Sequence, residues 1–374
     1  MKIFIISNAP RSLYRFRGKL IKELIHLGHE VHALTPIGES EDNISKIRST
    51  ASQVHEYYLN RTGVSLYQDF KTLISLIRLM RSIRPDMVFS YTIKPVIYGS
   101  IAASIARVPK VFSLINGTGF SFSDDGKSKI FLHFLIKRLF SISLKRNKFV
   151  FFQNKDDRDL FIQNNLVKAK LSGITNGSGV DLKEFNFHPM NKGNVIKFLY
   201  IGRFFKQKGI NLFVEAAKII KNKYGISVEF QLIGRIGNDK NSVKKDELES
   251  WEKKGLVKNL GFVEDVKSII VNSHVVVLPS YYREGVPRSL LEALAIGRAI
   301  ITTNSIGCKE TVKDGENGLL IEPNNLHALI EAIEVLINNS NLLEEMGKKS
   351  RILAEHKFDV DVINKYMLGK MNLV

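Results

Sequence analysis

The chain of 374 residues is 44% hydrophobic and carries a formal net charge of +18. This length and apolar content favour two domains, each with its own core, over a single domain. No apolar run is long enough to predict a transmembrane helix, and the lone cysteine, Cys308, excludes an intrachain disulfide and fits a reducing cytoplasm.

The first half of the chain alternates short apolar runs with amphipathic stretches. The apolar N-terminus is too short and wrongly flanked for a signal peptide, so we expect it to be a buried strand. Alternating strands and helices are typical of βαβ units around a parallel sheet. The expected strands are residues 2–6, 30–34, 87–91, 111–115 and 149–152, and the expected helices are 13–27 and 68–84, the latter with apolar residues at Phe70, Leu73, Ile74, Ile77 and Met80.

Positive charge is concentrated in this half. Residues 1–180 hold 27 Lys and Arg against 13 Asp and Glu, a balance of +14, whereas residues 181–374 hold 28 against 24. Such a half suits nucleic acid or an anionic membrane as its partner. Residues 127–148 favour the membrane, because seven Lys and Arg and no acidic residue accompany apolar residues at helical spacing. The pattern also fits a core helix with cationic ends, and one helix can serve both roles.

The alternation restarts after a polar stretch, residues 182–194, which is interpreted as a linker. We therefore predict an α/β chain with an N-terminal domain at residues 1–185 and a C-terminal domain at 186–357. Ligands of open α/β sheets bind beyond the carboxyl ends of the strands, so we expect a site in the cleft between two such domains. The elements expected in the second domain are strands at 195–201, 227–233, 274–278 and 298–303, and helices at 210–222, 242–254, 288–296, 326–338 and 342–356.

Two cations follow the first strand of the second domain. Arg203 and Lys208 lie in the stretch Gly202-Arg-Phe-Phe-Lys-Gln-Lys-Gly209, which leaves the strand just before a helical pattern. The forked guanidinium and the compact ammonium suit a diphosphate. Taken alone, cations in such a loop are more often solvated surface groups.

Glu284 and Glu292 bracket the start of a further helix in this domain. Pro287 suits the first position of that helix, and Gly297 suits the position after its end. Glu284 is then expected in the preceding loop and Glu292 about one turn inside, with an anion-binding helix N-terminus between them. Two carboxylates beside a phosphate site predict a nucleotide sugar as the ligand. The alternative is an ordinary strand–loop–helix with two solvated glutamates.

Three other motifs give weaker signals. The stretch Gly234-Arg-Ile-Gly237 follows an expected strand and suits contact with a nucleobase or its phosphates, but it lacks the third glycine of a dinucleotide fingerprint. Asp157-Arg-Asp159 and Asp359-Val-Asp361 are similar to an Asp-X-Asp metal motif. Both lie in charged, helical surroundings, so we expect solvated helix faces and no catalytic metal.

Together these motifs resemble a known family. Gly202-Arg203 with Lys208-Gly209, followed by the pair Glu284 and Glu292, is similar to the retaining GT-B glycosyltransferases of family 4. The resemblance implies two Rossmann-like domains that face an interdomain cleft, with residues 358–374 returning to the first domain. The stretches that resemble a bacterial subgroup extending glycans on an undecaprenyl carrier, for O-antigen, capsule or protein glycans, are Tyr91–Ala103, Gly117-Thr-Gly119, Phe151–Asn154, Gly177–Asp181 and Pro287–Glu292.

The resemblance also implies roles for the second domain, which would bind UDP-GalNAc, UDP-GlcNAc or UDP-galactose. Arg203 and Lys208 would neutralise the leaving diphosphate, and Glu284 would hold hydroxyls of the transferred sugar near the reacting centre. Glu292 would accept hydrogen bonds from the ribose. The anomeric configuration would be retained, and neither a metal nor another cofactor is expected. The rest of the implied donor site is Gly202, Gly234, Gly285, Val286, Pro287, Arg288 and Ser289.

The first domain would bind the acceptor, a saccharide on undecaprenyl diphosphate. Some relatives carry a histidine where this chain has Asn116-Gly-Thr-Gly119, so no general base is assigned. We expect a cytoplasmic protein that attaches peripherally to the anionic inner face of the bacterial membrane and does not bind nucleic acid. The competing functions are a nucleotide-sugar epimerase or hydrolase with the same fold, and a basic nucleic-acid-binding protein. The expected acceptor residues are Tyr14, Arg17, Lys94, Asn116, Gly117 and Gly119.

Overall fold

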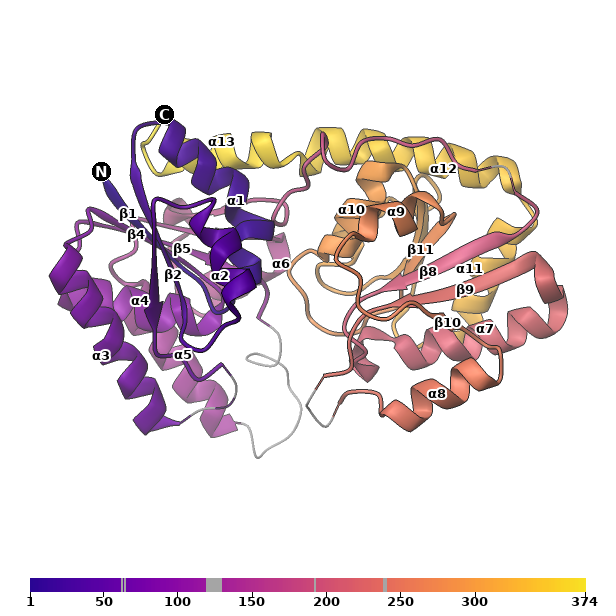
Figure 1. The fold of residues 1–374 in the computed structure, drawn as a ribbon, viewed down its shortest axis with the longest axis horizontal. Coiled ribbons are helices and arrows are strands. Elements are labelled where there is room, and N and C mark those ends of the chain that lie inside the picture. The colour runs from indigo at the N-terminus through magenta and orange to yellow at the C-terminus, as the bar shows by residue number, and fades with distance from the viewer. Residues whose placement is uncertain (62, 64, 119–129, 192, 238–240) are drawn as a thin grey trace. The chain divides into compact units, whose positions relative to one another are not determined.

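The computed structural model describes residues 1–374 except 62, 64, 119–129, 192 and 238–240. The chain forms two compact units (Figure 1): unit 1 consists of Met1–Ser178 and Asp361–Val374, and unit 2 of Gly179–Val360. Each unit is a parallel sheet covered by helices, which confirms the predicted α/β class with two Rossmann-like domains.

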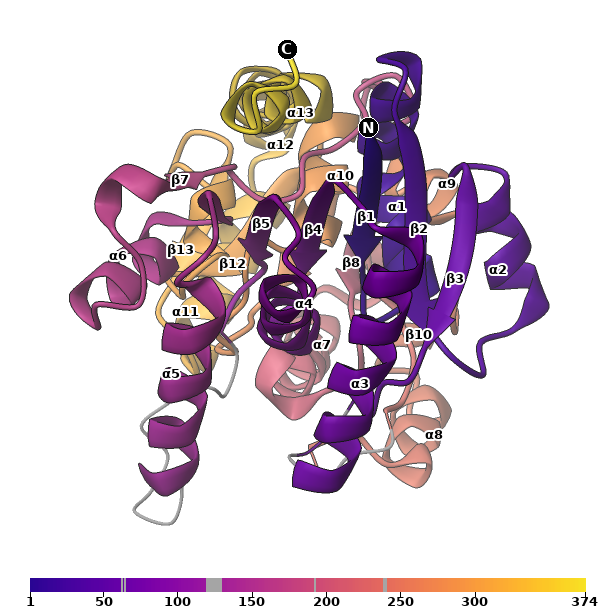
Figure 2. The ribbon, with the colours of Figure 1, turned by 90° about the vertical axis from the view of Figure 1, so that its left-hand side faces the viewer.

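Unit 1 is built on a seven-stranded parallel sheet with the order β3-β2-β1-β4-β5-β6-β7 (Figure 2). Its elements are β1 Lys2–Ile6, α1 Pro10–His26, β2 Glu30–Pro36, α2 Glu41–Arg48, β3 Gln53–Tyr57, α3 Leu66–Ile83, β4 Met87–Tyr91, α4 Ile93–Ile105, β5 Lys110–Ile115, α5 Ile130–Leu144, β6 Phe149–Phe152, α6 Lys155–Gln163, β7 Ser172–Ile174 and α13 Val360–Lys370. Side chains alternate along β1, so Ile3 and Ile5 pack in a core with α1 and α13. Phe4 and Ile6 pack on the other face with α3 and α4.

Unit 2 is built on a six-stranded parallel sheet with the order β10-β9-β8-β11-β12-β13. Its elements are β8 Ile196–Ile201, α7 Ile210–Tyr224, β9 Val228–Ile233, α8 Lys245–Lys253, β10 Lys258–Asn259, α9 Val266–Val271, β11 Val275–Leu278, α10 Arg288–Ile296, β12 Ala299–Thr303, β13 Gly318–Ile321, α11 Leu326–Ile337 and α12 Ser340–Leu353. All four residues of β11 are fully buried, as expected for a continuous apolar run in a parallel sheet covered on both faces.

The boundary between the units differs from the expected one after residue 185. Val180 already belongs to unit 2, where its N–H donates to Phe358 O at 2.8 Å and its carbonyl accepts from the N–H of Val360 at 3.1 Å. Phe185 is 2% exposed and lies in the core of unit 2. The interpretation of residues 182–194 as a linker is therefore wrong, because this polar stretch begins inside a folded unit.

The basic stretch 127–148 contains helix α5. Phe140 and Leu144 are buried in a cluster of unit 1, as the core-helix interpretation predicts. Phe134 and Ile142 are 65% and 56% exposed, as an interfacial helix requires. The structure thus gives α5 an inward apolar side together with exposed apolar residues. Lys127 lies outside the described residues.

Candidate functional site

The strand order of unit 2 reverses between β8 and β11. From β8 the chain adds β9 and then β10 on one side, and it later returns to place β11 on the other side of β8. A crevice forms at the carboxyl ends of the strands at such a reversal. The loops that follow these two strands are residues 202–209, with Arg203 and Lys208, and residues 279–287, with Glu284.

The loop after β8 is held against the end of β11. Gly209 has a φ of +74°, and a Cβ on it would lie 2.1 Å from the carbonyl oxygen of Pro279, so glycine is required. The Gln207 carbonyl accepts hydrogen bonds from the N–H groups of Tyr281 and Tyr282 at 3.0 and 3.1 Å. These contacts fix the two loops to each other.

Lys208 and Glu284 form an ion pair between these loops. Lys208 Nζ lies 3.0 Å from Glu284 Oε2, and the two side chains are only 14% and 12% exposed. Ser280 Oγ donates a hydrogen bond to Glu284 Oε1 at 3.0 Å. Because solvent screens partly buried charges weakly, this pair acts on a neighbouring ligand more strongly than surface charges would.

Arg203 lies earlier in the same loop. Its guanidinium carbon is 4.2 Å from the ring centroid of Phe205, and its backbone carbonyl accepts a hydrogen bond from Tyr200 Oη at 3.1 Å. Stacking on an aromatic face leaves the N–H groups of a guanidinium directed in its own plane. This arrangement is compatible with in-plane hydrogen bonds to a phosphate.

Helix α10 begins directly after the loop that carries Glu284. Pro287 precedes the first helical residue, one position earlier than predicted, and Gly297 follows the last one with a φ of +88°. The first N–H groups of an α-helix have no preceding turn to which they can donate, and Ser289 is the second residue of α10. The positive end of the helix dipole therefore faces the loop and favours an anion there.

Glu292 lies one turn inside α10, as predicted, and is 6% exposed. Arg288 Nε is 3.0 Å from Glu292 Oε1, and Arg288 Nη1 donates to the carbonyl oxygen of Gly179 at 2.8 Å. The alternative of a solvated glutamate is wrong for Glu292 and for Glu284, because both carboxylates are largely buried and paired with cations.

Gly202 and Gly234 follow neighbouring strands whose last residues, Ile201 and Ile233, are paired. A Cβ on Gly234 would lie 1.9 Å from the carbonyl oxygen of Gly202. This close approach of two backbones is sufficient to require glycine at position 234.

The strand β12 also contributes residues that the sequence analysis missed. Ser305 Oγ donates to the carbonyl oxygen of Ser280 at 2.9 Å, and Thr303 Oγ1 donates to the same oxygen. Gly307 has a φ of +86°, and a Cβ there would lie 1.7 Å from Gly285 O and 2.7 Å from Glu284 O. Residues 303–307 thus support the segment that carries Glu284. The sequence signal that could have identified these residues is a polar loop that follows a buried strand and ends in glycine.

We predict that Gly307→Ala lowers the free energy of unfolding by about 1–3 kcal/mol, because the added methyl group is strained and displaces Glu284 and Gly285. Urea unfolding measures the stability, and initial rates should fall by about tenfold or more. Gly315→Ala is the matched control, since Gly315 has a φ of +74° with no atom within 4 Å of the added Cβ. Equal losses of activity in the two variants would contradict the role of Gly307.

The charge of Glu284 affects two buried groups beside it. Burial, and next the Glu284 carboxylate, raise the pKa of the Tyr200 phenol well above its usual value. The same two causes raise the pKa of the Cys308 thiol to about 12. Cys308 is fully buried and stays protonated at neutral pH, so it is a small core residue and not a nucleophile.

The predicted acceptor residues are distributed over unit 1. Tyr14 Oη donates to Asn43 Oδ1 at 3.3 Å, and the buried Arg17 lies 5.4 Å from the ring centroid of Tyr91. Lys94 Nζ is 2.8 Å from Asp69 Oδ1 and also donates to a backbone carbonyl at 2.8 Å. The charge of Lys94 is thus already balanced within the unit.

The other predicted acceptor residues follow β5. Asn116 and Gly117 come directly after this strand, and Gly117 has a φ of +110°. Gly119 lies outside the described residues.

The Asp-X-Asp motif at residues 157–159 differs from the expected solvated face. Asp157 is fully buried, and it accepts hydrogen bonds from Thr118 Oγ1 at 3.2 Å and Asn154 Nδ2 at 3.0 Å. Asp159 and Asp361 pair instead with Lys155 and with Lys19. Over the described residues, no three His, Cys, Asp or Glu side chains gather as a metal site would require.

Two family models cover most of the chain. The model for glycosyl transferases group 1 matches residues 183–352, and the model for glycosyl transferase 4-like domains matches residues 2–154. The UDP-Gal:alpha-D-GlcNAc-diphosphoundecaprenol alpha-1,3-galactosyltransferase of Escherichia coli is 32% identical over 80% of this chain and 78% of its own length. The chain belongs to the family 4 type of GT-B glycosyltransferases.

Other comparisons agree with this assignment. The glycosyltransferase is 27% identical, over 94% of its length and 93% of the relative, to N,N'-diacetylbacillosaminyl-diphospho-undecaprenol alpha-1,3-N-acetylgalactosaminyltransferase of Campylobacter jejuni. Its fold matches the crystal structure of Anabaena HepE in complex with UDP-glucose with a TM-score of 0.79 and 18% identity, over 100% of both chains. In the described part of the chain, no helix has the length and apolar character needed to span a membrane.

Proposed function

We propose that this glycosyltransferase is a retaining, metal-independent enzyme that moves a hexose or N-acetylhexosamine from a UDP-sugar to a saccharide on undecaprenyl diphosphate. The observation that carries the proposal is the Lys208–Glu284 pair at the strand reversal of unit 2, directly before the N-terminus of α10. The names of the Campylobacter and Escherichia relatives support an acceptor on diphospho-undecaprenol. Such an enzyme would act in the synthesis of O-antigen, capsule or protein-linked glycans.

Different residues of the donor site would bind the diphosphate, the transferred sugar and the ribose of the nucleotide sugar. Lys208, Arg203 and the first turn of α10 would stabilise the negative charge that grows on the leaving diphosphate. Glu284 is held by Lys208 and Ser280 and would accept hydrogen bonds from hydroxyls of the transferred sugar. Glu292 would bind the ribose hydroxyls. The cations and the helix dipole would supply the charge neutralisation that a metal provides in other transferases.

The acceptor would bind at the corresponding reversal of unit 1, between β1 and β4. Thr92, which the sequence analysis missed, directly follows β4 with a φ of +70°, a conformation that β-branched residues avoid and that is found mostly at functional sites. Among the described residues, Asn116 Oδ1 is buried and accepts no hydrogen bond. These two positions are the best-supported candidates on the acceptor side.

A donor screen tests this function. UDP-GalNAc, UDP-GlcNAc, UDP-galactose and a GDP-hexose are each incubated with an undecaprenyl-diphosphate saccharide, and products are identified by mass spectrometry. NMR of the product gives its anomeric configuration, which is expected to match that of the donor. Activity is expected to persist in EDTA; full loss that manganese restores would contradict metal independence.

The competing functions give different results in the same assay. An epimerase or hydrolase would turn over the nucleotide sugar without any acceptor. A nucleic-acid-binding protein would show no turnover with any donor and would bind nucleic acid in a salt-dependent manner.

We further propose that the enzyme attaches peripherally to the inner face of the cytoplasmic membrane through the basic half of the chain. Helix α5 supports this, because Phe134 and Arg138 within the helix are exposed, and so are Lys145 and Arg146 directly after its end. Each such cation near an anionic leaflet contributes about 1 kcal/mol to binding.

Reversing the charges of Lys137, Arg138, Lys145 and Arg146 together should therefore release the protein from anionic vesicles. Co-sedimentation measures this release, and wild-type binding should weaken as salt rises. Turnover of a short water-soluble acceptor should persist, because the donor site lies in unit 2. Equal binding to neutral and anionic vesicles would contradict the proposal, and a variant that does not fold would favour a purely structural role for α5.

A further inference from the structure

The guanidinium of Arg288 connects two stretches of unit 2 that lie far apart in the sequence. Its Nη1 donates to the carbonyl oxygen of Gly179 at 2.8 Å, and its Nε donates to Glu292 Oε1 at 3.0 Å. Gly179 lies in the stretch 177–181, which the sequence analysis singled out and the proposed mechanism does not use. One side chain thus bridges that stretch and a carboxylate of the donor site.

Arg288 occupies a position that helix stability alone does not favour. It is the first residue of α10, where the positive end of the helix dipole disfavours a cation. Its side chain is nevertheless only 17% exposed, and its guanidinium carbon lies 5.9 Å from the ring centroid of Phe185. Glu292 follows four residues later and is therefore on the same face of the helix. Arg288 is packed and paired within unit 2 instead of extending into solvent.

The backbone to which Arg288 binds is itself held firmly. Gly179 is buried, and the next residue, Val180, donates its N–H to Phe358 O at 2.8 Å and accepts from the N–H of Val360 at 3.1 Å. A little further on, Phe185 is 2% exposed in the core of unit 2. A carbonyl acceptor in such a segment has a fixed place, so it also fixes the guanidinium that donates to it.

Glu292 requires a partner of this kind. Its side chain is 8% exposed, and burying a carboxylate without a cation or hydrogen-bond donors is costly. A carboxylate has about four acceptor positions, of which the contact with Arg288 uses one, at Oε1. Glu292 can therefore be held by Arg288 and still accept hydrogen bonds from two hydroxyl groups.

We propose that Arg288 is a positioning residue, which orients the Glu292 carboxylate toward the ribose hydroxyls of the donor and does not bind the diphosphate itself. Binding groups act best when a second layer of hydrogen bonds fixes their orientation before the ligand arrives. The pair would then determine the preference of the enzyme for a ribonucleotide. The inference rests on the proposed function, in which Glu292 binds the ribose.

Binding of UDP and of 2′,3′-dideoxy-UDP, which lacks both ribose hydroxyls, tests the proposal by isothermal titration calorimetry. The wild-type protein should prefer UDP by a factor on the order of ten or more, the effect expected for hydrogen bonds to a charged acceptor. In Arg288→Ala the preference should fall to about threefold or less, because a carboxylate without a fixed orientation keeps only part of that energy. Arg288→Met keeps the packing against Phe185 and should show the same loss, so it replaces the alanine variant if that variant does not fold.

Arg351 of α12 provides a matched control. Its side chain is also 17% exposed and pairs with a glutamate four residues later, Glu355, at 2.7 Å. It likewise joins the same segment to α10, through the carbonyl oxygens of Phe185 at 3.0 Å and Ala295 at 2.8 Å, but it has no contact with Glu292. Arg351→Ala should lower the temperature of unfolding and keep the wild-type preference for UDP. If both variants lose the preference equally, the effect is a general loosening of the segment and the proposal is overturned.

Uridine distinguishes positioning of Glu292 from direct binding of the diphosphate. Arg288→Ala should weaken uridine and UDP alike, since both carry the ribose hydroxyls. If it weakens UDP and 2′,3′-dideoxy-UDP equally and leaves uridine unchanged, Arg288 binds the diphosphate and the proposal is wrong. Combining Arg288→Ala with Glu292→Ala should weaken UDP little more than Glu292→Ala alone, because residues that act through each other are not additive; fully additive losses would also overturn the proposal.

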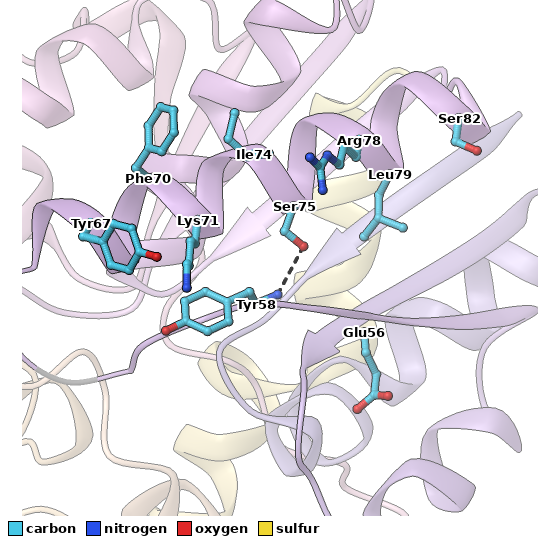
Figure 3. A pocket seen from close by; sticks show the side chains of 10 residues that line it. All are labelled: Glu56, Tyr58, Tyr67, Phe70, Lys71, Ile74, Ser75, Arg78, Leu79 and Ser82. Carbon is cyan, nitrogen blue, oxygen red and sulfur yellow. Dashed lines mark hydrogen bonds between the residues drawn. The ribbon is translucent and has the colours of Figure 1, made fainter.

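A groove along α3 of unit 1 provides a control for nucleotide binding elsewhere on the protein. Its volume is about 740 Å³, and aromatic and cationic side chains line it, among them Tyr58, Lys71 and Arg78 (Figure 3). Lys71 Nζ lies 5.8 Å from the ring centroid of Tyr58, so a base and a phosphate both find chemically suitable groups there. Lys71→Ala with Arg78→Ala should keep the wild-type affinity and preference for UDP. If this variant loses the preference, the preference arises in the groove and the proposal is overturned.

The same measurements separate this inference from the proposed function. A wild-type protein that binds UDP and 2′,3′-dideoxy-UDP equally well would refute the ribose contact of Glu292 itself, whatever the Arg288 variants show. A wild-type preference that Glu292→Ala abolishes and Arg288→Ala retains would leave the proposed function intact and refute only the positioning role of Arg288.

Discussion

Glu284→Ala is expected to lower kcat by a factor on the order of 100 or more, through loss of a contact that strengthens in the transition state. The structure supports a large effect, because Glu284 is 12% exposed, pairs with Lys208 at 3.0 Å and accepts a hydrogen bond from Ser280. Steady-state kinetics with the donor and acceptor found in the screen measure the loss.

Glu284→Gln separates the charge from the shape of this side chain. The amide retains an oxygen that can accept from Ser280 Oγ, so the loop should keep its conformation. It removes the negative charge, so kcat should still fall strongly. Near-normal turnover of Glu284→Ala, with thermal unfolding unchanged, would exclude Glu284 from the mechanism, whereas near-normal turnover of Glu284→Gln alone would exclude only a role for its charge.

Lys208→Ala and Arg203→Ala should each weaken binding of the nucleoside diphosphate by about 1.5–3 kcal/mol, the range for hydrogen bonds to charged groups. We expect the larger effect for Lys208, because its removal leaves the buried carboxylate of Glu284 beside the diphosphate without its cation. Isothermal titration calorimetry with UDP measures both affinities.

Lys206→Ala is the control for these two variants. It removes the same charge from the same loop, but Lys206 is exposed and none of the proposed contacts includes it. UDP affinity should change little. If all three variants lose affinity equally, the loop attracts the diphosphate only through its overall charge; unchanged affinity of the Lys208 and Arg203 variants would contradict the assignment.

Local patterns in the sequence were sufficient to predict the elements around the donor site. The apolar run of β11, together with Pro287 and Gly297, places α10 and the loop before it to within one residue. These signals are local because each depends on backbone geometry at a single position.

The pairing of Lys208 with Glu284 could not be predicted from local patterns. It depends on β8 and β11 being neighbours, which is a property of the strand order. The support from Thr303, Ser305 and Gly307 depends in the same way on β12 lying beside β11. The sequence shows which charged and polar residues each loop contains, but only the order of the strands shows which of these residues are in contact.

Helical periodicity also failed to predict burial at two places. Phe70 has the spacing of a core residue, yet it is 61% exposed, because it lies near the start of α3, before the turns that pack on the sheet. Asp157 has the charged neighbours of a surface residue, yet it is fully buried and accepts hydrogen bonds from Thr118 and Asn154. Both cases depend on where an element ends relative to its neighbours, which a single helix pattern does not contain.

The return of the chain from unit 2 to unit 1 has a consequence for engineering. Met1 and Val374 both belong to unit 1, so unit 2 is an insertion within a discontinuous domain. Ile363 and Met367 of α13, and Met371 directly after it, lie in the core formed with α1 and β1, so a fragment that stops at Ser178 lacks part of that core. A chimera with altered donor preference should therefore exchange residues 179–360 as one cassette and keep both junctions.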